Sequence, residues 1–370
     1  MRSNIRLGRI LGIPIGLNVS WFPALGLVVS LLLLRVYPDI SPASRWLLAW
    51  ISALLFFIWI VIHELAHSIV ALRLGIPVKE ITLFFLGGVA RIAREASRPR
   101  DELVMAAAGP IASLLLSGFF FLLWLVSGGG DGALPTLWQW LWLMNLAMGL
   151  FNLVPGFPMD GGRVFRALLW GMMGSHYKST LVSARLGQGI ALGLIGFGAF
   201  VALPGNVVPD MAPVNGIWLM MIGVFLNASA SQSYAQTRLL EELRQYKVGR
   251  AMSKLPMSVS EDMSVAEALG WCGPKGYLLV RTGDNVSGVV EGRRLGEVPA
   301  PHREGIRVAS VMTAAKQAAV ISPDGDMAEA VQIMETEEVS HLPVVEEGRV
   351  VGYVGKDSLW ALVQRPSPAA

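Results

Sequence analysis

Six long apolar runs fill the first 237 residues of this 370-residue chain. A helix needs roughly 20 apolar residues to cross the hydrocarbon core of a bilayer. Backbone polar groups find no water there, so a run of this kind crosses lipid only as a helix that satisfies its own hydrogen bonds. The sequence therefore predicts six membrane-spanning helices, near residues 17–36, 46–73, 103–126, 134–154, 181–203 and 214–236.

Composition separates this apolar part from the rest of the chain. Hydrophobic residues make up 53% of the chain and charged residues only 15%, well away from soluble averages. Residues 238–365, in contrast, have the mixed pattern of an ordinary soluble domain. The net charge of +3 is too small and dispersed to favour a nucleic-acid partner. The single cysteine, Cys272, excludes internal disulfides and a thiolate metal cluster.

Lysine and arginine gather on one side of the expected spans. Cytosolic loops of membrane proteins are enriched in these residues, so we expect both the N-terminus and the soluble part to lie in the cytosol. Arg35 and Arg45, which flank the first outer loop, weaken this pattern. The basic residues on the inner side are Arg2, Arg6, Arg9, Arg91, Arg94, Arg98, Arg100, Arg163, Arg166, Lys178, Arg238 and Arg244.

The second apolar run contains the sequence His-Glu-Leu-Ala-His at residues 63–67. Positions i and i+4 lie on one face of a helix, so the imidazoles of His63 and His67 can bind one metal ion, with Glu64 beside them. Ionisable residues inside an apolar span are costly unless they have partners, and they indicate a functional site. We expect one Zn²⁺ per chain here.

A hydrolytic zinc ion takes three protein ligands and leaves one position open for water. The chain has only five histidines, and His176, His302 and His341 lie in a cytosolic loop or in the soluble part, so a carboxylate is expected as the third ligand. Asp160 follows the fourth span on the inner side and is our candidate. A plain turn at Asp160–Gly162 is the alternative.

Together these motifs resemble the site-2 protease family of intramembrane zinc metalloproteases. The resemblance covers roughly residues 1–235 and implies a core of the second, third and fourth spans around a zinc ion that water reaches from the cytosol. It also implies a multi-pass protein of a prokaryotic cell membrane. The residues that carry it are His63–His67, Gly87, Gly88, Ala108–Pro110, Asn152, Pro155, Pro158 and Asp160–Gly162.

The expected chemistry assigns two catalytic residues. Glu64 would act as the general base, taking a proton from the zinc-bound water and later donating it to the leaving amine. The resemblance implies that the amide of Asn152 hydrogen-bonds the substrate carbonyl or the oxyanion. A packing role between helices is the alternative for Asn152.

Residues 78–93 are too few to span a membrane, and their β-branched and aromatic side chains predict a hairpin at membrane depth that breaks at Gly87 and Gly88. An open strand edge does not face lipid. We therefore expect a substrate strand to pair with this hairpin, which makes Gly87 and Gly88 candidate substrate-binding residues. A cytosolic loop with a turn is the alternative.

The soluble part contains an internal repeat of strand, helix, strand, strand and helix. Residues 341–345 and 352–354 resemble CBS modules, which pair in tandem and often sense adenosyl ligands. The resulting fold class is a multi-span α-helical membrane protein, of about six helices and a short membrane-associated β-hairpin, followed by a soluble α/β tandem CBS domain. The expected divisions are a protease domain (1–237), a connecting helix (238–247), two CBS repeats (248–305 and 306–365) and a disordered tail (366–370).

The CBS pair departs from the nucleotide-binding pattern. Such modules usually carry an Asp six residues after the strand glycine, where this chain has Ser358 and Arg294. Asp357 is one residue early, and one residue turns a helical side chain by about 100°. We therefore expect weak or absent ATP and AMP binding by residues 245–364, and a steric, docking or homodimerising role for the pair. His341 is expected to be structural rather than a ligand contact.

Two functions remain. The favoured one is an intramembrane zinc metalloendopeptidase that cuts transmembrane proteins, single-pass ones above all, in regulated proteolysis under CBS control. The alternative is a non-proteolytic membrane zinc carrier or scaffold with CBS sensing. Glu64 distinguishes them, because only hydrolysis needs a carboxylate beside the metal rather than bound to it.

Overall fold

The computed structural model describes residues 4–38, 40–85, 87–130, 132–203, 213–254, 257–273, 276–283 and 285–358. The chain divides into two compact units, Met1–Thr237 and Arg238–Ala370. The predicted disordered tail, residues 366–370, lies outside the described residues.

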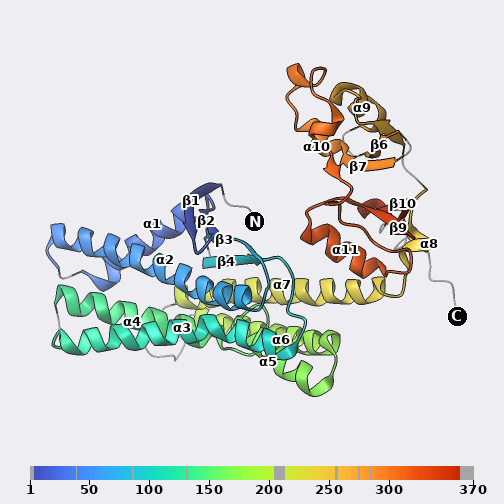
Figure 1. Ribbon diagram of the computed structural model, residues 1–370. Coiled ribbons are helices and arrows are strands. Elements are labelled where there is room, and N and C mark those ends of the chain that lie inside the picture. Colours follow the sequence, from blue (N-terminus) through green and yellow to red (C-terminus); the bar gives the residue numbers. More distant parts are fainter. Residues whose placement is uncertain are drawn as a thin grey trace. The chain divides into compact units, whose positions relative to one another are not determined.

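The first unit is mainly helical (Figure 1). Among the described residues, α2, α3, α6 and α7 are long and apolar enough to cross a membrane. The other two expected spans correspond to α1 with its π-helical turn, which is shorter, and to α4, and their crossing stays a prediction. The helices are α1 (Trp21–Leu31), the π turn (Leu32–Val36), α2 (Pro42–Arg73), α3 (Pro99–Val126), α4 (Ala133–Asn152), α5 (Asp160–Met173), α6 (His176–Ala202) and α7 (Pro213–Leu243).

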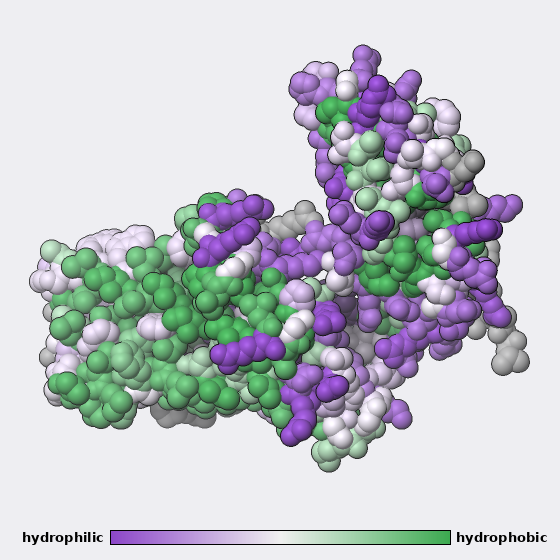
Figure 2. Space-filling model, viewed as in Figure 1, coloured by the Kyte–Doolittle hydropathy of each residue, from purple (hydrophilic) through white to green (hydrophobic). Residues whose placement is uncertain are grey.

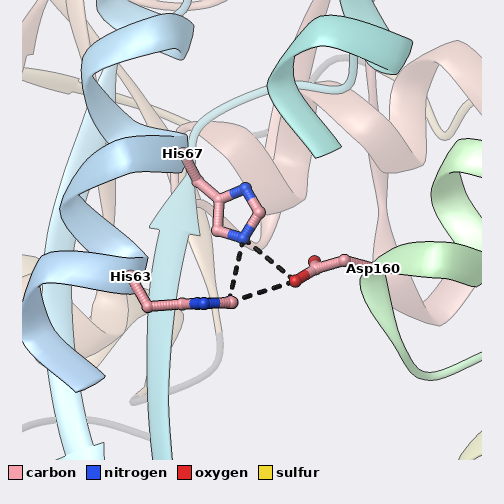
Figure 3. A group of neighbouring side chains, drawn as sticks. All are labelled: His63, His67 and Asp160. Atoms are coloured by element: carbon pink, nitrogen blue, oxygen red, sulfur yellow. Dashed lines mark hydrogen bonds and ion pairs between the residues drawn. The ribbon is translucent and has the colours of Figure 1, made fainter. Parts of the chain in front are cut away.

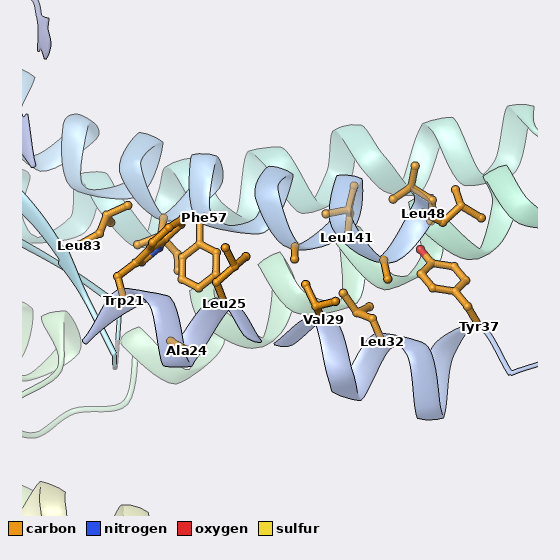
Figure 4. Close-up of a cluster of buried hydrophobic side chains, with 14 of the residues drawn as sticks. Trp21, Ala24, Leu25, Val29, Leu32, Tyr37, Leu48, Phe57, Leu83 and Leu141 are labelled. Atoms are coloured by element: carbon orange, nitrogen blue, oxygen red, sulfur yellow. The ribbon is translucent and has the colours of Figure 1, made fainter. Parts of the chain in front are cut away.

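Helix α3 is central, since it contacts α2, α4 and α5. A large apolar cluster joins α1, α2 and α4, and in it the ring of Trp21 packs edge-to-face on that of Phe57 at 5.2 Å (Figure 4). Large hydrophobic side chains such as Leu115 and Leu122 remain exposed on the outside of α3. The helical unit accordingly presents a broad hydrophobic face (Figure 2), as a lipid-facing surface requires.

Four strands form a sheet in the order β1-β2-β3-β4. The hairpin of β3 (Val78–Phe84) and β4 (Gly87–Ile92) is antiparallel, and β4 is an edge strand. Sequence analysis did not anticipate β1 (Ile5–Ile10) or β2 (Ile13–Leu17), which precede the first helix. Strand β2 pairs in parallel with β3, placing Ile15 beside Ile81. The N-terminal segment is therefore a hairpin that extends the sheet.

The second unit repeats one order of elements twice. In the first repeat, the order is β5, α9, β6 and β7. In the second repeat, Ile321 takes the place of the first strand and is followed by α11, β9 and β10; it forms a parallel bridge with Val344 of β9. Ser264 and Asp326 cap α9 and α11 at equivalent places. The elements are α8 (Val248–Ala251), β5 (Ser258–Ser260), α9 (Val265–Cys272), β6 (Tyr277–Thr282), β7 (Asn285–Glu291), α10 (Gly292–Gly296), β8 (Thr313–Ala314), α11 (Met327–Thr336), β9 (His341–Glu346) and β10 (Arg349–Gly355), with short 3₁₀ turns at Ala300–His302 and Val308–Ser310.

Candidate metal centre

Three predicted metal ligands meet in the first unit (Figure 3). His63 and His67 project from α2, one turn apart, and Asp160 is the first residue of α5. Oδ2 of Asp160 lies 3.1 Å from Nε2 of His63 and 3.1 Å from Nε2 of His67. The two Nε2 atoms are 3.3 Å apart. The side chains thus form a nearly equilateral triangle of donor atoms.

This triangle fits a zinc ion. Atoms bound to one tetrahedral zinc at about 2.0–2.1 Å lie roughly 3.3–3.4 Å apart, close to all three observed separations. Both histidines are buried and Asp160 is nearly so. Two imidazoles and one carboxylate are also the ligand set of zinc hydrolases that keep a position open for water. His63, His67 and Asp160 therefore suit a catalytic zinc ion.

Helix α3 orients both imidazoles. Nδ1 of His67 donates a hydrogen bond of 2.7 Å to the carbonyl oxygen of Met105, and Nδ1 of His63 lies 2.8 Å from the hydroxyl of Ser113. A carbonyl only accepts, so the proton of His67 lies on Nδ1 and its Nε2 lone pair is free for a metal. Sequence analysis missed both partners, because only packing shows which residues of α3 face the histidines.

Gly109 leaves the space that the two rings occupy. A Cβ at this position would lie 2.2 Å from Nε2 of His67 and 2.7 Å from Nε2 of His63. No side chain larger than hydrogen fits beside the ligands. Gly109 of the Ala-Gly-Pro motif therefore has a steric role beside the two imidazoles.

The glycine pair after Asp160 lets α5 begin against the preceding loop. A Cβ on Gly161 would lie 2.3 Å from the carbonyl oxygen of Leu153, and one on Gly162 would lie 2.4 Å from the carbonyl carbon of Gly156. Backbone packs directly on backbone there. This close approach brings Asp160 to the histidines, and these residues form the N-terminus of a helix rather than the plain turn that was the alternative.

The predicted base borders the hairpin. Oε2 of Glu64 accepts a hydrogen bond of 3.1 Å from the backbone N–H of Ala90 in β4. A Cβ on Gly88 would meet Cγ of Glu64 at 2.8 Å, so the strand packs tightly on this side chain. Gly87, with a φ of +136°, opens the strand. Asn152 ends α4 and is half-buried, and its role in catalysis stays a prediction.

The second unit contains a cavity of about 310 Å³ between its repeats. Tyr277 and His341 stack at 5.2 Å on its wall, and Nδ1 of His341 lies 3.5 Å from Oε1 of Glu291. Burial opposes ionisation of Glu291, but hydrogen bonds from His341 and the backbone of Ser340 outweigh it and keep its pKa below the usual value. His341 therefore has structural contacts at the start of β9 while also lining the cavity.

Comparisons with known proteins agree with these two units. The family model of peptidase family M50 matches residues 51–130 and 130–196, and the CBS domain model matches residues 308–359. A solved site-2 protease of Methanocaldococcus jannaschii is 31% identical, with a TM-score of 0.44, and the match covers 62% of this chain and 94% of that one.

Two relatives match this chain along nearly its whole length. A Synechocystis sp. protein named "Putative zinc metalloprotease sll0528" is 32% identical over 98% of this chain and 96% of its own length. A zinc metalloprotease of Methanocaldococcus jannaschii is 30% identical over 97% of this chain and 96% of its own. With two of its three candidate metal ligands on the apolar helix α2, the chain belongs to peptidase family M50, the site-2 proteases, and is a membrane zinc metalloprotease with a C-terminal pair of CBS domains.

Proposed function

We propose that this metalloprotease hydrolyses peptide bonds of transmembrane proteins, within or at the edge of the bilayer, in regulated proteolysis. The observation that carries the proposal is the placement of His63 and His67 in α2, a helix long and apolar enough to span a membrane. A centre on such a helix reaches peptide bonds that soluble proteases do not. We place the enzyme in a prokaryotic cell membrane, with its N-terminus and CBS pair in the cytosol.

The chain's own groups supply the proton transfers. A bound zinc ion would provide Lewis acidity toward water and the scissile carbonyl. Glu64 takes a proton from the attacking water and delivers it to the nitrogen of the leaving amine, so that the C–N bond breaks without a free amide anion. The amide of Asn152 donates a hydrogen bond to the oxygen that gains negative charge.

Strand β4 would hold the substrate in an extended form. A helical substrate must unwind before its backbone reaches the base, and pairing with a strand edge replaces the hydrogen bonds that it loses. Three observations support this role for Gly87, Gly88 and their neighbours: β4 is at the sheet edge, its Ala90 N–H contacts Glu64, and Gly88 packs against Glu64. An added strand would therefore run beside the base.

The CBS pair would control activity from the cytosol by docking or steric means, and it offers a surface for a homodimer. The cavity between the repeats is not well suited to bind a nucleotide. Nη1 of Arg294 donates a hydrogen bond of 2.6 Å to the hydroxyl of Thr313, so two polar groups of the cavity wall are already paired with each other. A nucleotide would have to displace this contact.

Substrate trapping tests the proposal. Glu64→Gln protein, purified from cells that lack the wild-type protein, should retain zinc and accumulate uncleaved single-pass membrane proteins, identified by mass spectrometry. His67→Ala protein serves as the control for binding without an intact centre. Enrichment of soluble proteins alone, or cleavage of the accumulated proteins by the Glu64→Gln variant, would contradict an intramembrane endopeptidase with Glu64 as its base.

A further inference from the structure

A buried ion pair lies close to the metal centre without touching it. Glu102, in the first turn of α3, and Arg166, on α5, are 1% and 6% exposed. Nε of Arg166 donates a hydrogen bond of 2.8 Å to Oε1 of Glu102, and Nη2 contacts the same oxygen. The guanidinium also lies 5.2 Å from the ring centroid of Phe157, in the loop before α5.

This pair is a poor source of stability. Burying two charges costs several kcal/mol per ion, and well-packed apolar replacements of buried pairs are often equally stable or more so. The second carboxylate oxygen of Glu102 is buried without a hydrogen-bond partner in the described part of the chain, which adds to the cost. A further contact, from Arg166 to the exposed Glu95, is long at 3.7 Å. Net stability is therefore a weak explanation for the pair.

The pair does connect the two helices that together determine the ligand geometry. Helix α3 orients His63 through Ser113 and His67 through Met105. Helix α5 begins with Asp160, and Arg166 follows six residues later, about 9 Å along the helix. An anchor at Arg166 therefore sets where the start of α5 lies relative to the histidines.

Small displacements at this point matter. The three donor atoms already stand 3.1–3.3 Å apart, near the separations that a tetrahedral zinc requires. A carboxylate that moved with the end of α5 would leave this triangle, whereas both imidazoles would stay fixed on α2. Zinc affinity, rather than folding, is therefore the property that should depend on the contact between Glu102 and Arg166.

We propose that Glu102 and Arg166 form a positioning pair for the metal ligand Asp160, holding α5 against α3 so that the carboxylate meets the two imidazoles. The pair acts through Asp160 and is not itself catalytic. This inference concerns zinc binding, and it holds whichever protein the enzyme cuts.

The test separates zinc affinity from fold stability. In the full-length chain in detergent, the double variant Glu102→Leu/Arg166→Met removes the charges and keeps apolar volume. We expect its metal-free form to unfold at the same temperature as the wild type or higher, while its zinc affinity, measured by chelator competition, falls by about 10- to 100-fold. Arg163→Met, on the same helix, is the matched control and should leave zinc affinity unchanged.

Two outcomes would overturn the proposal. One is a folded double variant with wild-type zinc affinity. The other concerns Glu102→Gln, which keeps the shape of the side chain and decides the matter if the double variant does not fold. We expect Glu102→Gln to lower zinc affinity. We also expect the charge-reversed double variant Glu102→Arg/Arg166→Glu to bind zinc more tightly than the single variant Arg166→Glu. Unchanged affinity in Glu102→Gln would assign the pair to stability alone.

Discussion

The carboxylate of Glu64 accepts a hydrogen bond from the backbone N–H of Ala90, with Oε2 and N 3.1 Å apart. This contact joins the helix that carries two metal ligands to the edge strand of the sheet. Glu64, the predicted base, therefore contacts the strand on which we place the substrate. Both the chemistry and the substrate geometry can be tested through residues around this contact.

Glu64→Gln should retain about one zinc ion per chain but lose at least about a hundredfold in cleavage of a transmembrane test substrate, because the base is absent while all three ligands remain. Elemental analysis and a gel-based cleavage assay measure the two properties. Glu242→Gln, an exposed carboxylate on α7, is the control. Unchanged turnover in the Glu64 variant would assign the base to another residue.

Gly109→Ala should abolish zinc binding, because its Cβ would lie 2.2 Å from Nε2 of His67. Gly118→Ala is a matched control on the same helix, since a Cβ there meets nothing within 4 Å. Both substitutions raise helix propensity equally. A difference in zinc content between the two variants therefore reflects the metal site and not the helix. Normal zinc content in Gly109→Ala would show that the rings have room that the structure does not provide.

Asp160→Ala should lower zinc content as well as activity, since it removes one of three ligands. His67→Ala should behave alike. Zinc content is measured by elemental analysis after dialysis against a weak chelator. Full zinc occupancy in the Asp160 variant would mean that a different carboxylate completes the centre.

Membrane orientation can be tested by cysteine labelling in a Cys272→Ser background. A cysteine at Ser127, at the end of α3, should react with an impermeant reagent added outside intact cells, and one at Ser253 should react only after the cells are opened. The reverse pattern would invert the topology and place the CBS pair outside the cytosol.

Calorimetry on the full-length protein in detergent should show no micromolar affinity for ATP or AMP. Ser358 and Arg294 stand where a ribose-binding carboxylate is expected, and Arg294 is bonded to Thr313. Micromolar affinity that Asp357→Ala abolishes would restore nucleotide sensing. Affinity that appears only in Arg294→Ala would show that the contact with Thr313 closes the cavity.

Sequence analysis was most informative where periodicity decides geometry. His63 and His67 share a helix face because four residues make about one turn, and the repeat of the second unit is visible in the matching patterns at Ser264 and Asp326. It was least informative at the N-terminus. Residues 5–17 contain few signals beyond alternation, and their place in the sheet comes from pairing with β3, far along the chain.

The sequence by itself indicated apolar helices long enough to cross a membrane, two histidines and a glutamate on one of them, and an acidic residue as the candidate third metal ligand. Local spacing is enough for these conclusions. Only the tertiary structure decided which groups surround the ligands: Ser113, Met105 and Gly109 from α3, and the Glu102–Arg166 pair that joins α3 to α5. Contacts between distant segments depend on packing, and packing has no local signature in a uniformly apolar helix.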